Sequence, residues 1–416
     1  MFIINKLTSF VSLNIILQII YWVIALFNYK YPGFYFDAVL PEHTEIQNLN
    51  NINDNPTWTF PSMIPLLAGP YSGNLPFFTS IVIFYLFGAN EFTLRIAQYF
   101  LGSILVLIFS FILKEITKKK WICFLGTLLI IVEPTFIMSF RTEAGLNLVG
   151  AIFLLLAFKY LFFIKNKKDI FIIGLLLGLS FYGYFNYLFF FFIFLFFLFI
   201  YSPIKKMLLL KFYFFGFFIG SIGYLIGYLS SISFLGGIDN FINYFTVQFT
   251  SVDPFRADET YYESLILSIN KFFSSVLNHG NESMVFSKVY SDDFKEIKRY
   301  FFSLSIFLPL IFWLFHKKRF SHHSIMVNPI ILPVSIIMFI IFQSILGSRL
   351  HSHHFILLLP VIYLTFIIFI NDFFNFLNLR FVQFKKINSF WPYLITVPIL
   401  VSILFVSFIQ VKKYND

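Results

Sequence analysis

Long stretches without charge constrain this chain more than any other feature. The run between Asp169 and Lys205 contains no Asp, Glu, Lys or Arg. It is too long for one membrane helix, which needs about 20 residues to cross ~30 Å of hydrocarbon. The sequence "YGYFN" at 182–186 supplies glycine and asparagine for a turn that divides the run. Only 12% of the 416 residues are charged, about half the fraction typical of soluble domains, so the composition is that of an integral membrane protein.

The other apolar stretches also have the length of membrane helices. They predict an all-α polytopic membrane protein, with a single integral membrane domain over residues 1–416 and about eleven transmembrane helices. The single cysteine, Cys123, excludes an internal disulfide. The expected helices lie at 9–28, 92–113, 121–139, 143–163, 170–185, 187–202, 212–230, 301–315, 328–346, 354–371 and 391–411.

Basic residues mark one side of this predicted domain. They cluster in alternate turns between the expected helices: Lys114 and Lys118 to Lys120; Lys165, Lys167 and Lys168; Lys205, Lys206 and Lys211; Lys317 to Arg319; and Arg380, Lys385 and Lys386. By the positive-inside rule these turns face the cytoplasm, and the long segments 29–91 and 231–300 face outward. Lys412 and Lys413 would lie outside, against the rule. The net charge of +10 is scattered over the turns, which excludes a continuous nucleic-acid-binding patch.

The two long outer segments are expected to carry helices at the membrane surface. In 29–91 the apolar sequence "TSIVIFYLFGANEF" (79–92) is too short to span. In 231–300 the sequences "NFINYFTVQF" and "YYESLILSINKFFSSVL" have an amphipathic pattern. No inverted repeat of the kind found in secondary transporters is detectable.

Acidic residues come directly after the first apolar stretch. Asp37 and Glu42 follow it within the sequence "GFYFDAVLPEHTE" (33–45). A carboxylate at the outer membrane boundary ionises easily and can reach a substrate from lipid or from water. The other readings of Asp37 are a solvated loop acid and the N-cap of a following helix.

A cluster of basic and imidazole groups precedes the expected helix 354–371. The sequence "GSRLHSHHF" gathers Arg349, His351, His353 and His354. Cations beside a helix N-terminus favour phosphate binding; a metal site and a polar interfacial turn are the alternatives. Glu133, inside an apolar stretch beside Pro134, predicts either a buried salt bridge or a partly exposed site at a kink.

Four separated stretches resemble the GT-C glycosyltransferases related to protein O-mannosyltransferases and lipid A aminoarabinose transferases (glycosyltransferase family 39). They occur in the order and at the spacing of that family and cover about a sixth of the chain. They are "FDAVLPE" (36–42), "LFGANEFTLRIAQYFLGSILVLIF" (86–109), "EPTFIMSFRTEAGLNLVGAIFLLLAF" (133–158) and "SHHFILLLPVIYL" (352–364).

The resemblance implies transfer of a sugar from a polyprenyl-phosphate donor to a lipid, glycan or protein acceptor. Asp37 matches the family's catalytic acid and would act as the base for the acceptor hydroxyl. Many members place a second acid directly after it, where this chain has Ala38, and Glu42 could take that role. A divalent metal ion as cofactor is left open.

The resemblance also implies substrate-binding residues. Arg95 and Arg141 match conserved family arginines, Glu143 lies near the family's usual acid, and His354 stands where an Arg or His is common. The expected setting is a bacterial inner membrane, with the active site facing the periplasm or exterior. The rival readings are a polysaccharide polymerase or ligase, which would place its essential acid in later loops, and a lipid-linked transporter, which would place charges in broken helices at mid-bilayer.

Overall fold

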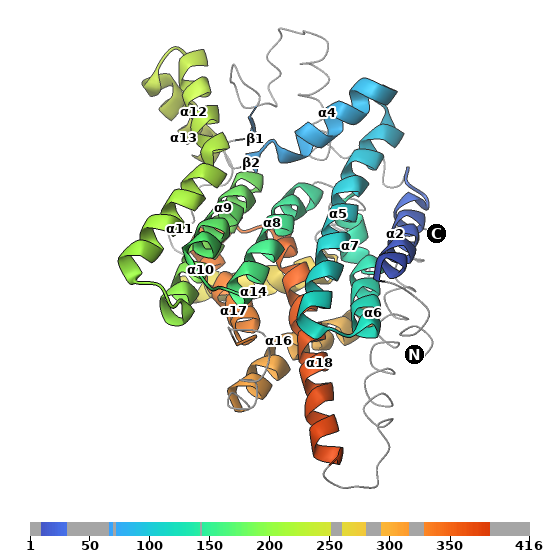
Figure 1. Ribbon diagram of the computed structural model, residues 1–416. Helices are drawn as coiled ribbons and strands as arrows, with labels where there is room; N and C mark the ends of the chain where they lie inside the picture. The colour runs from blue at the N-terminus through green and yellow to red at the C-terminus, as the bar shows by residue number, and fades with distance from the viewer. Residues whose placement is uncertain are drawn as a thin grey trace.

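A computed structural model describes residues 10–30, 66–69, 72–141, 144–250, 260–279, 293–315 and 328–382. These ranges form an all-helical body with one short antiparallel hairpin, β1 (Leu67–Gly69) with β2 (Ser72–Gly73) (Figure 1). The helical class predicted from sequence is confirmed.

Fifteen α-helices and three short 3-10 helices make up the described body. The α-helices are α2 (Phe10–Leu26), α4 (Leu75–Phe87), α5 (Glu91–Thr117), α6 (Lys120–Ile131), α7 (Pro134–Ser139), α8 (Ala144–Phe162), α9 (Lys167–Gly183), α10 (Leu188–Tyr201), α11 (Lys206–Gly220), α12 (Ile222–Phe234), α13 (Ile238–Thr250), α14 (Tyr261–Val276), α16 (Asp293–Phe315), α17 (Ile331–Gln343) and α18 (Leu359–Val382). The 3-10 helices are η1 (Phe185–Tyr187), η3 (Ser344–Arg349) and η4 (Ser352–Leu358).

Three of the described helices are long and apolar enough to cross a membrane. They are α5, the part of α16 from Lys295 to Phe315, and the continuous stretch Ser352–Leu377 of η4 and α18. The bent pair α11 and α12, with an angle of 52° between its halves, makes a fourth if it counts as one span. The eleven expected crossings are therefore not shown, because most other apolar helices are shorter and residues 391–411 lie outside the described ranges.

Several local predictions are confirmed or adjusted. The break expected at 182–186 is present, because α9 ends at Gly183 and α10 begins at Leu188. The helix expected at 79–92 begins earlier and ends at Phe87, where Gly88 takes a positive φ of 77°. Asn90 then caps α5, its side chain accepting a hydrogen bond from the backbone of Thr93 at 3.1 Å.

The two segments expected at the membrane surface within 231–300 are helices α13 and α14. α14 is not confined to the surface, because it packs against α17, η3 and η4. Its Ser268 hydroxyl donates to the Ile340 carbonyl at 2.6 Å, and Phe272 is 2% exposed. The amphipathic pattern therefore identified the helix, while its apolar face covers protein.

The helices of the body give it two chemically different ends. α2 and α5 are antiparallel, since Lys114 lies 4.1 Å from the ring of Phe10 and the Tyr21 hydroxyl donates to the Tyr99 carbonyl at 3.0 Å. We call the end with Lys114 and the turn between α5 and α6 the Lys119 end, and the opposite end the Arg141 end. In Figure 1, α4, the β-hairpin, α12 and α13 lie at the Arg141 end, and the last turns of α18 extend from the Lys119 end.

Contacts between other helices agree with this division. At the Lys119 end, Lys159 near the end of α8 pairs with Glu115 at 3.2 Å, and the Lys119 ammonium donates to the Asn375 amide oxygen at 2.6 Å. At the Arg141 end, the ring of Tyr184 lies 6.1 Å from that of His354. The described lysine clusters in the turns after α5 and α8 thus gather at one end, as the positive-inside reading expected.

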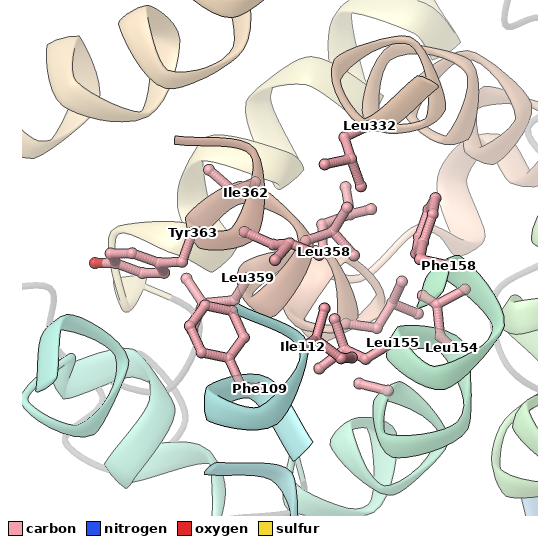
Figure 2. Close-up of a cluster of buried hydrophobic side chains, with 14 of the residues drawn as sticks. Phe109, Ile112, Leu154, Leu155, Phe158, Leu332, Leu358, Leu359, Ile362 and Tyr363 are labelled. Carbon is pink, nitrogen blue, oxygen red and sulfur yellow. The ribbon is translucent and has the colours of Figure 1, made fainter. Parts of the chain in front are cut away.

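The centre of the body surrounds the first turns of α18. Leu358, Leu359 and Ile362 are fully buried there. Figure 2 shows them packed against side chains of three other helices: Phe109 and Ile112 of α5, Leu154, Leu155 and Phe158 of α8, and Leu332 of α17. This apolar centre holds in place the helix starts at the Arg141 end.

Glycines bring α9 and α11 into direct backbone contact. A Cβ added at Gly178 would lie 2.3 Å from the Phe217 carbonyl oxygen, and one added at Gly220 would lie 2.2 Å from that of Leu175. Gly178 follows Gly174 by four positions, a small-residue spacing that lets membrane helices approach closely. The two helices run parallel, with α10 between them in sequence.

Gly178→Ala is expected to destabilise the protein by about 1–3 kcal/mol, because the added methyl group overlaps a backbone oxygen that cannot move without separating the helices. Phe218→Ala is the control, since Phe218 is exposed on α11 and its loss should change the free energy of unfolding little. Chemical denaturation of the purified protein in detergent measures both. Equal stability of Gly178→Ala and wild type would contradict the described α9–α11 contact.

Candidate functional site

Arg141 follows α7 and reaches back to the C-terminal end of α2. Its Nη2 donates to the carbonyl oxygens of Phe27 at 2.7 Å and Ala25 at 3.2 Å, and its Nε donates to the Tyr99 hydroxyl at 3.2 Å. The last carbonyls of a helix have no partner within the helix and carry the negative end of its dipole. Since Arg141 is 1% exposed, it acts as a buried cap for α2.

Arg95, in the second turn of α5, holds the main chain of Arg141. Its Nη1 donates to the Arg141 carbonyl oxygen at 2.7 Å, and its side chain is as deeply buried. We call Arg95 and Arg141 the arginine pair. The pair ties together the end of α2, the start of α5 and the end of α7.

The arginine pair differs from what the sequence suggested. The resemblance implies that Arg95 and Arg141 bind substrate, whereas the contacts described above are with the backbone and a tyrosine of the protein. A role toward a substrate stays a prediction for both. Asp37, Glu42 and Glu143 lie outside the described residues, and the segment that contains Asp37 begins just beyond the α2 end that the arginine pair holds.

The histidine turn, His351 to His354, also lies at the Arg141 end. The rings of His351 and His353 are stacked, 5.4 Å apart with an interplanar angle of 4°, and the ring of His354 stands 4.6 Å from that of His353 at 82°. The chain enters this turn through Gly347, whose φ of 53° breaks the helical path after α17. Glycine suits this left-handed conformation.

Two residues that the sequence analysis did not select approach the histidine turn. Lys271 of α14 interacts electrostatically with His353 and His354, and Tyr184 lies beside His354. The backbone of Arg349 belongs to η3, and its side chain is outside the description. The turn therefore combines imidazoles with an ammonium group contributed by a separate helix.

Among the residues that the structure describes, no set of side chains fits a metal ion. In the part of the chain that the structure describes, no group of three or more His, Cys, Asp and Glu side chains is arranged to hold one. The divalent metal left open by the sequence has no described ligands, and no step below depends on it.

Glu133 lies at the centre of a buried polar network. It occupies the break between α6 and α7 and is 0% exposed. Its Oε1 lies 2.5 Å from the ammonium of Lys298 on α16, and its Oε2 accepts a hydrogen bond from the hydroxyl of Tyr363 on α18. The backbone N–H of Thr135 donates to Oε1 at 3.2 Å. Of the two readings for Glu133, the structure confirms the buried salt bridge.

A second polar cluster lies at the Lys119 end. Asp372 is 3% exposed and accepts a hydrogen bond from Trp313 Nε1 at 3.0 Å. Lys119 stands above the ring of Phe374, 4.1 Å from its centre. Burial lowers the pKa of Lys119 to about 8, and the nearby charge of Asp372 opposes that shift.

An apolar groove of about 830 Å³ runs between α2 and α5. Asn14 and Gln18 are the polar residues of its lining, and Gln18 is engaged by the Ser103 hydroxyl at 2.5 Å. The remaining lining residues are hydrophobic: Phe10, Val11, Ile15, Ile19, Trp22, Val23, Leu26, Leu107, Ile108 and Phe111. The groove suits hydrocarbon and offers no group for chemistry.

No protein-family model matches the chain, and no curated protein matches it. The resemblance to the GT-C glycosyltransferases consequently stands on the four sequence stretches and on the chemistry of the residues they contain.

Proposed function

We propose that this protein is a membrane glycosyltransferase that moves a sugar from a polyprenyl-phosphate donor to a lipid, glycan or protein acceptor. One observation carries the proposal: cationic and imidazole groups gather at the end of the helical body where the segment with Asp37 begins. Transfer from a lipid phosphate requires positive charge near the departing phosphate, close to a base for the acceptor. The arginine pair, the histidine turn and Lys271 at the Arg141 end support the first requirement, and the segment with Asp37 follows α2 there in sequence.

In the proposed reaction the acceptor hydroxyl oxygen attacks the anomeric carbon of the donor sugar. The bond from that carbon to the phosphate oxygen breaks, and the lipid phosphate leaves with the electron pair. Asp37 takes the hydroxyl proton, and Glu42 supports it. Arg349, His353 and His354, with Lys271, stabilise the departing phosphate, while Arg95, Arg141 and Glu143 order the surroundings of Asp37.

We further propose eleven crossings of a bacterial inner membrane, with the Arg141 end toward the periplasm or exterior. The gathering of described lysines at the opposite end supports this orientation. With this orientation, the donor phosphate and the acceptor meet at the outer surface of the membrane.

Cysteine labelling tests the orientation. In a Cys123→Ser background, a cysteine replacing Lys30, which is exposed at the Arg141 end, should react with a membrane-impermeant maleimide in intact cells. A cysteine replacing Lys167, which is exposed at the start of α9, should react only after permeabilisation. The reverse pattern would overturn the orientation and with it the outward-facing site.

Binding of the donor phosphate tests the role of the histidine turn. Undecaprenyl phosphate should raise the thermal-unfolding midpoint of the purified protein more than undecaprenol does, because ligands that bind the native state stabilise it. Lys271→Met should weaken this binding by about 10–100-fold, the equivalent of one hydrogen bond to a charged group. Lys211→Met, an exposed lysine near the start of α11, is the control.

Two results would contradict the phosphate site. Equal stabilisation by undecaprenol would mean that only the hydrocarbon is recognised. Equal loss in Lys271→Met and Lys211→Met would mean that overall charge, and not the histidine turn, attracts the phosphate.

A further inference from the structure

We propose that Glu133 and Lys298 are positioning residues, whose buried ion pair fixes α7 and Arg141 and thereby sets where the segment with Asp37 leaves the helical body. The catalytic meaning of this positioning rests on the proposed function. The mechanical link between the ion pair and the end of α2 does not, and it can be measured separately.

The ion pair is isolated from solvent and fully engaged. The Lys298 side chain is 6% exposed, and its ammonium lies 2.5 Å from Glu133 and 5.7 Å from the centre of the Phe302 ring. Both carboxylate oxygens of Glu133 are used, one by Lys298 and Thr135 and the other by Tyr363. Buried charges are tolerated when they are paired and hydrogen-bonded in this way.

α7 connects this pair to Arg141. Glu133 caps the helix at its N-terminus, and Pro134 provides its first residue. At the other end the Arg141 N–H donates to the Met138 carbonyl at 2.9 Å, so the arginine continues the last turn. A displacement of the Glu133 carboxylate would therefore be carried through one short, buried helix to the guanidinium that holds α2.

The same short helix also holds both sides of residues 280–292. The Thr135 hydroxyl donates to the carbonyl of Val276, the last residue of α14, at 3.2 Å. Lys298 lies in the second turn of α16, on the far side of that segment. One unit, residues 133–141, thus contacts the chain just before the segment 29–91 and within the segment 231–300.

The position of residues 133–141 depends on the charges of Glu133 and Lys298 as well as on packing. Removing one partner of a buried pair leaves an uncompensated charge, which destabilises the structure around it. Removing both partners leaves no buried charge and can restore stability. Loss of Lys298 alone should therefore disturb α7 and the end of α2, and loss of both charges should not.

A nitroxide spin label at Lys30 reports on the end of α2. The label is attached through Lys30→Cys in a Cys123→Ser background, at an exposed turn just beyond α2. Lys298→Met should increase the mobility of the label, and Glu133→Gln combined with Lys298→Met should return it to the parent spectrum. Arg299→Met is the matched control, since Arg299 pairs with Glu296 at the exposed surface of the same helix.

A milder pair of variants keeps the test decisive if Lys298→Met fails to fold. Tyr363→Phe removes only the hydroxyl that donates to Glu133, and Tyr213→Phe removes a buried hydroxyl that donates to the Phe191 carbonyl on α10. Tyr363→Phe should increase the mobility of the spin label at position 30, and Tyr213→Phe should leave it unchanged.

Unchanged spectra in folded Lys298→Met and Tyr363→Phe proteins would overturn the proposal, as would equal changes in the two controls. Because the spectra require no sugar transfer, this failure is distinct from failure of the proposed function. A protein without transferase activity that still shows the expected spectra would retain the positioning role and lose the enzymatic one.

Discussion

Asp37→Asn is expected to slow sugar transfer by about 10²–10⁴-fold, the usual contribution of a positioned general base. Asparagine keeps the size of the side chain and much of its hydrogen bonding but cannot accept the proton of the acceptor hydroxyl. Binding of undecaprenyl phosphate should survive, because the proposed phosphate site lies at the histidine turn and Lys271. Glu42→Gln should cost less activity than Asp37→Asn.

A deletion strain provides the measurement. Mass spectrometry of its envelope lipids, glycans and glycoproteins should reveal the product that loses a sugar, and complementation should restore it. Asp54→Asn is the control, since it makes the same change in the same segment and should complement fully. Near wild-type transfer by purified Asp37→Asn protein would remove Asp37 from the mechanism while leaving the fold untouched.

Lys298→Met is expected to lower the free energy of unfolding by about 3–5 kcal/mol, because it leaves the Glu133 carboxylate buried without its counter-charge. Arg299→Met should change it by less than about 1 kcal/mol, as exposed ion pairs contribute little. The combined Glu133→Gln and Lys298→Met protein should recover most of the loss.

Denaturant titration of the wild type, Glu133→Gln, Lys298→Met and the combined variant forms a double-mutant cycle for the pair. A strongly positive coupling between Glu133 and Lys298 is the expected result. If the two single variants and the combined variant lose stability additively, the two charges do not interact in the folded protein and the described contact is wrong.

The helices of this protein were largely predictable, because their signal is local. Apolar runs of suitable length identified α5, α8 and α18, and the glycine and asparagine at 182–186 identified the break between α9 and α10. Membrane crossing is a property of length as well as composition. The structure shows fewer helices of full membrane length than the apolar stretches suggested.

The partners of the buried charges were not predictable from sequence. Glu133 was recognised as unusual, yet Lys298 is 165 positions away and Tyr363 is 230. Lys298 lies just before an expected membrane helix, where a surface lysine is ordinary. No local pattern distinguishes a lysine that turns inward from one that faces the lipid headgroups, since both can extend along apolar surface.

Arg95 and Arg141 illustrate the same limit in another form. Their charge near helix ends was visible, and it favoured contact with an anion. In the structure Arg141 instead binds carbonyls at the C-terminal end of α2, which carries partial negative charge, and Arg95 binds the Arg141 carbonyl. The C-terminal end of a helix and a substrate phosphate both attract a guanidinium through negative charge. Only the three-dimensional structure shows which of the two the arginine binds.

The parallel contact between α9 and α11 has a consequence for how the protein is made. Gly174 and Gly178 of α9 emerge from the ribosome before their partners Tyr213, Phe217 and Gly220 on α11, and the whole of α10 must be synthesised in between. During that interval the glycine face of α9 has no native neighbour. A chain interrupted within α10 would therefore leave that face without α11 and open to other helices.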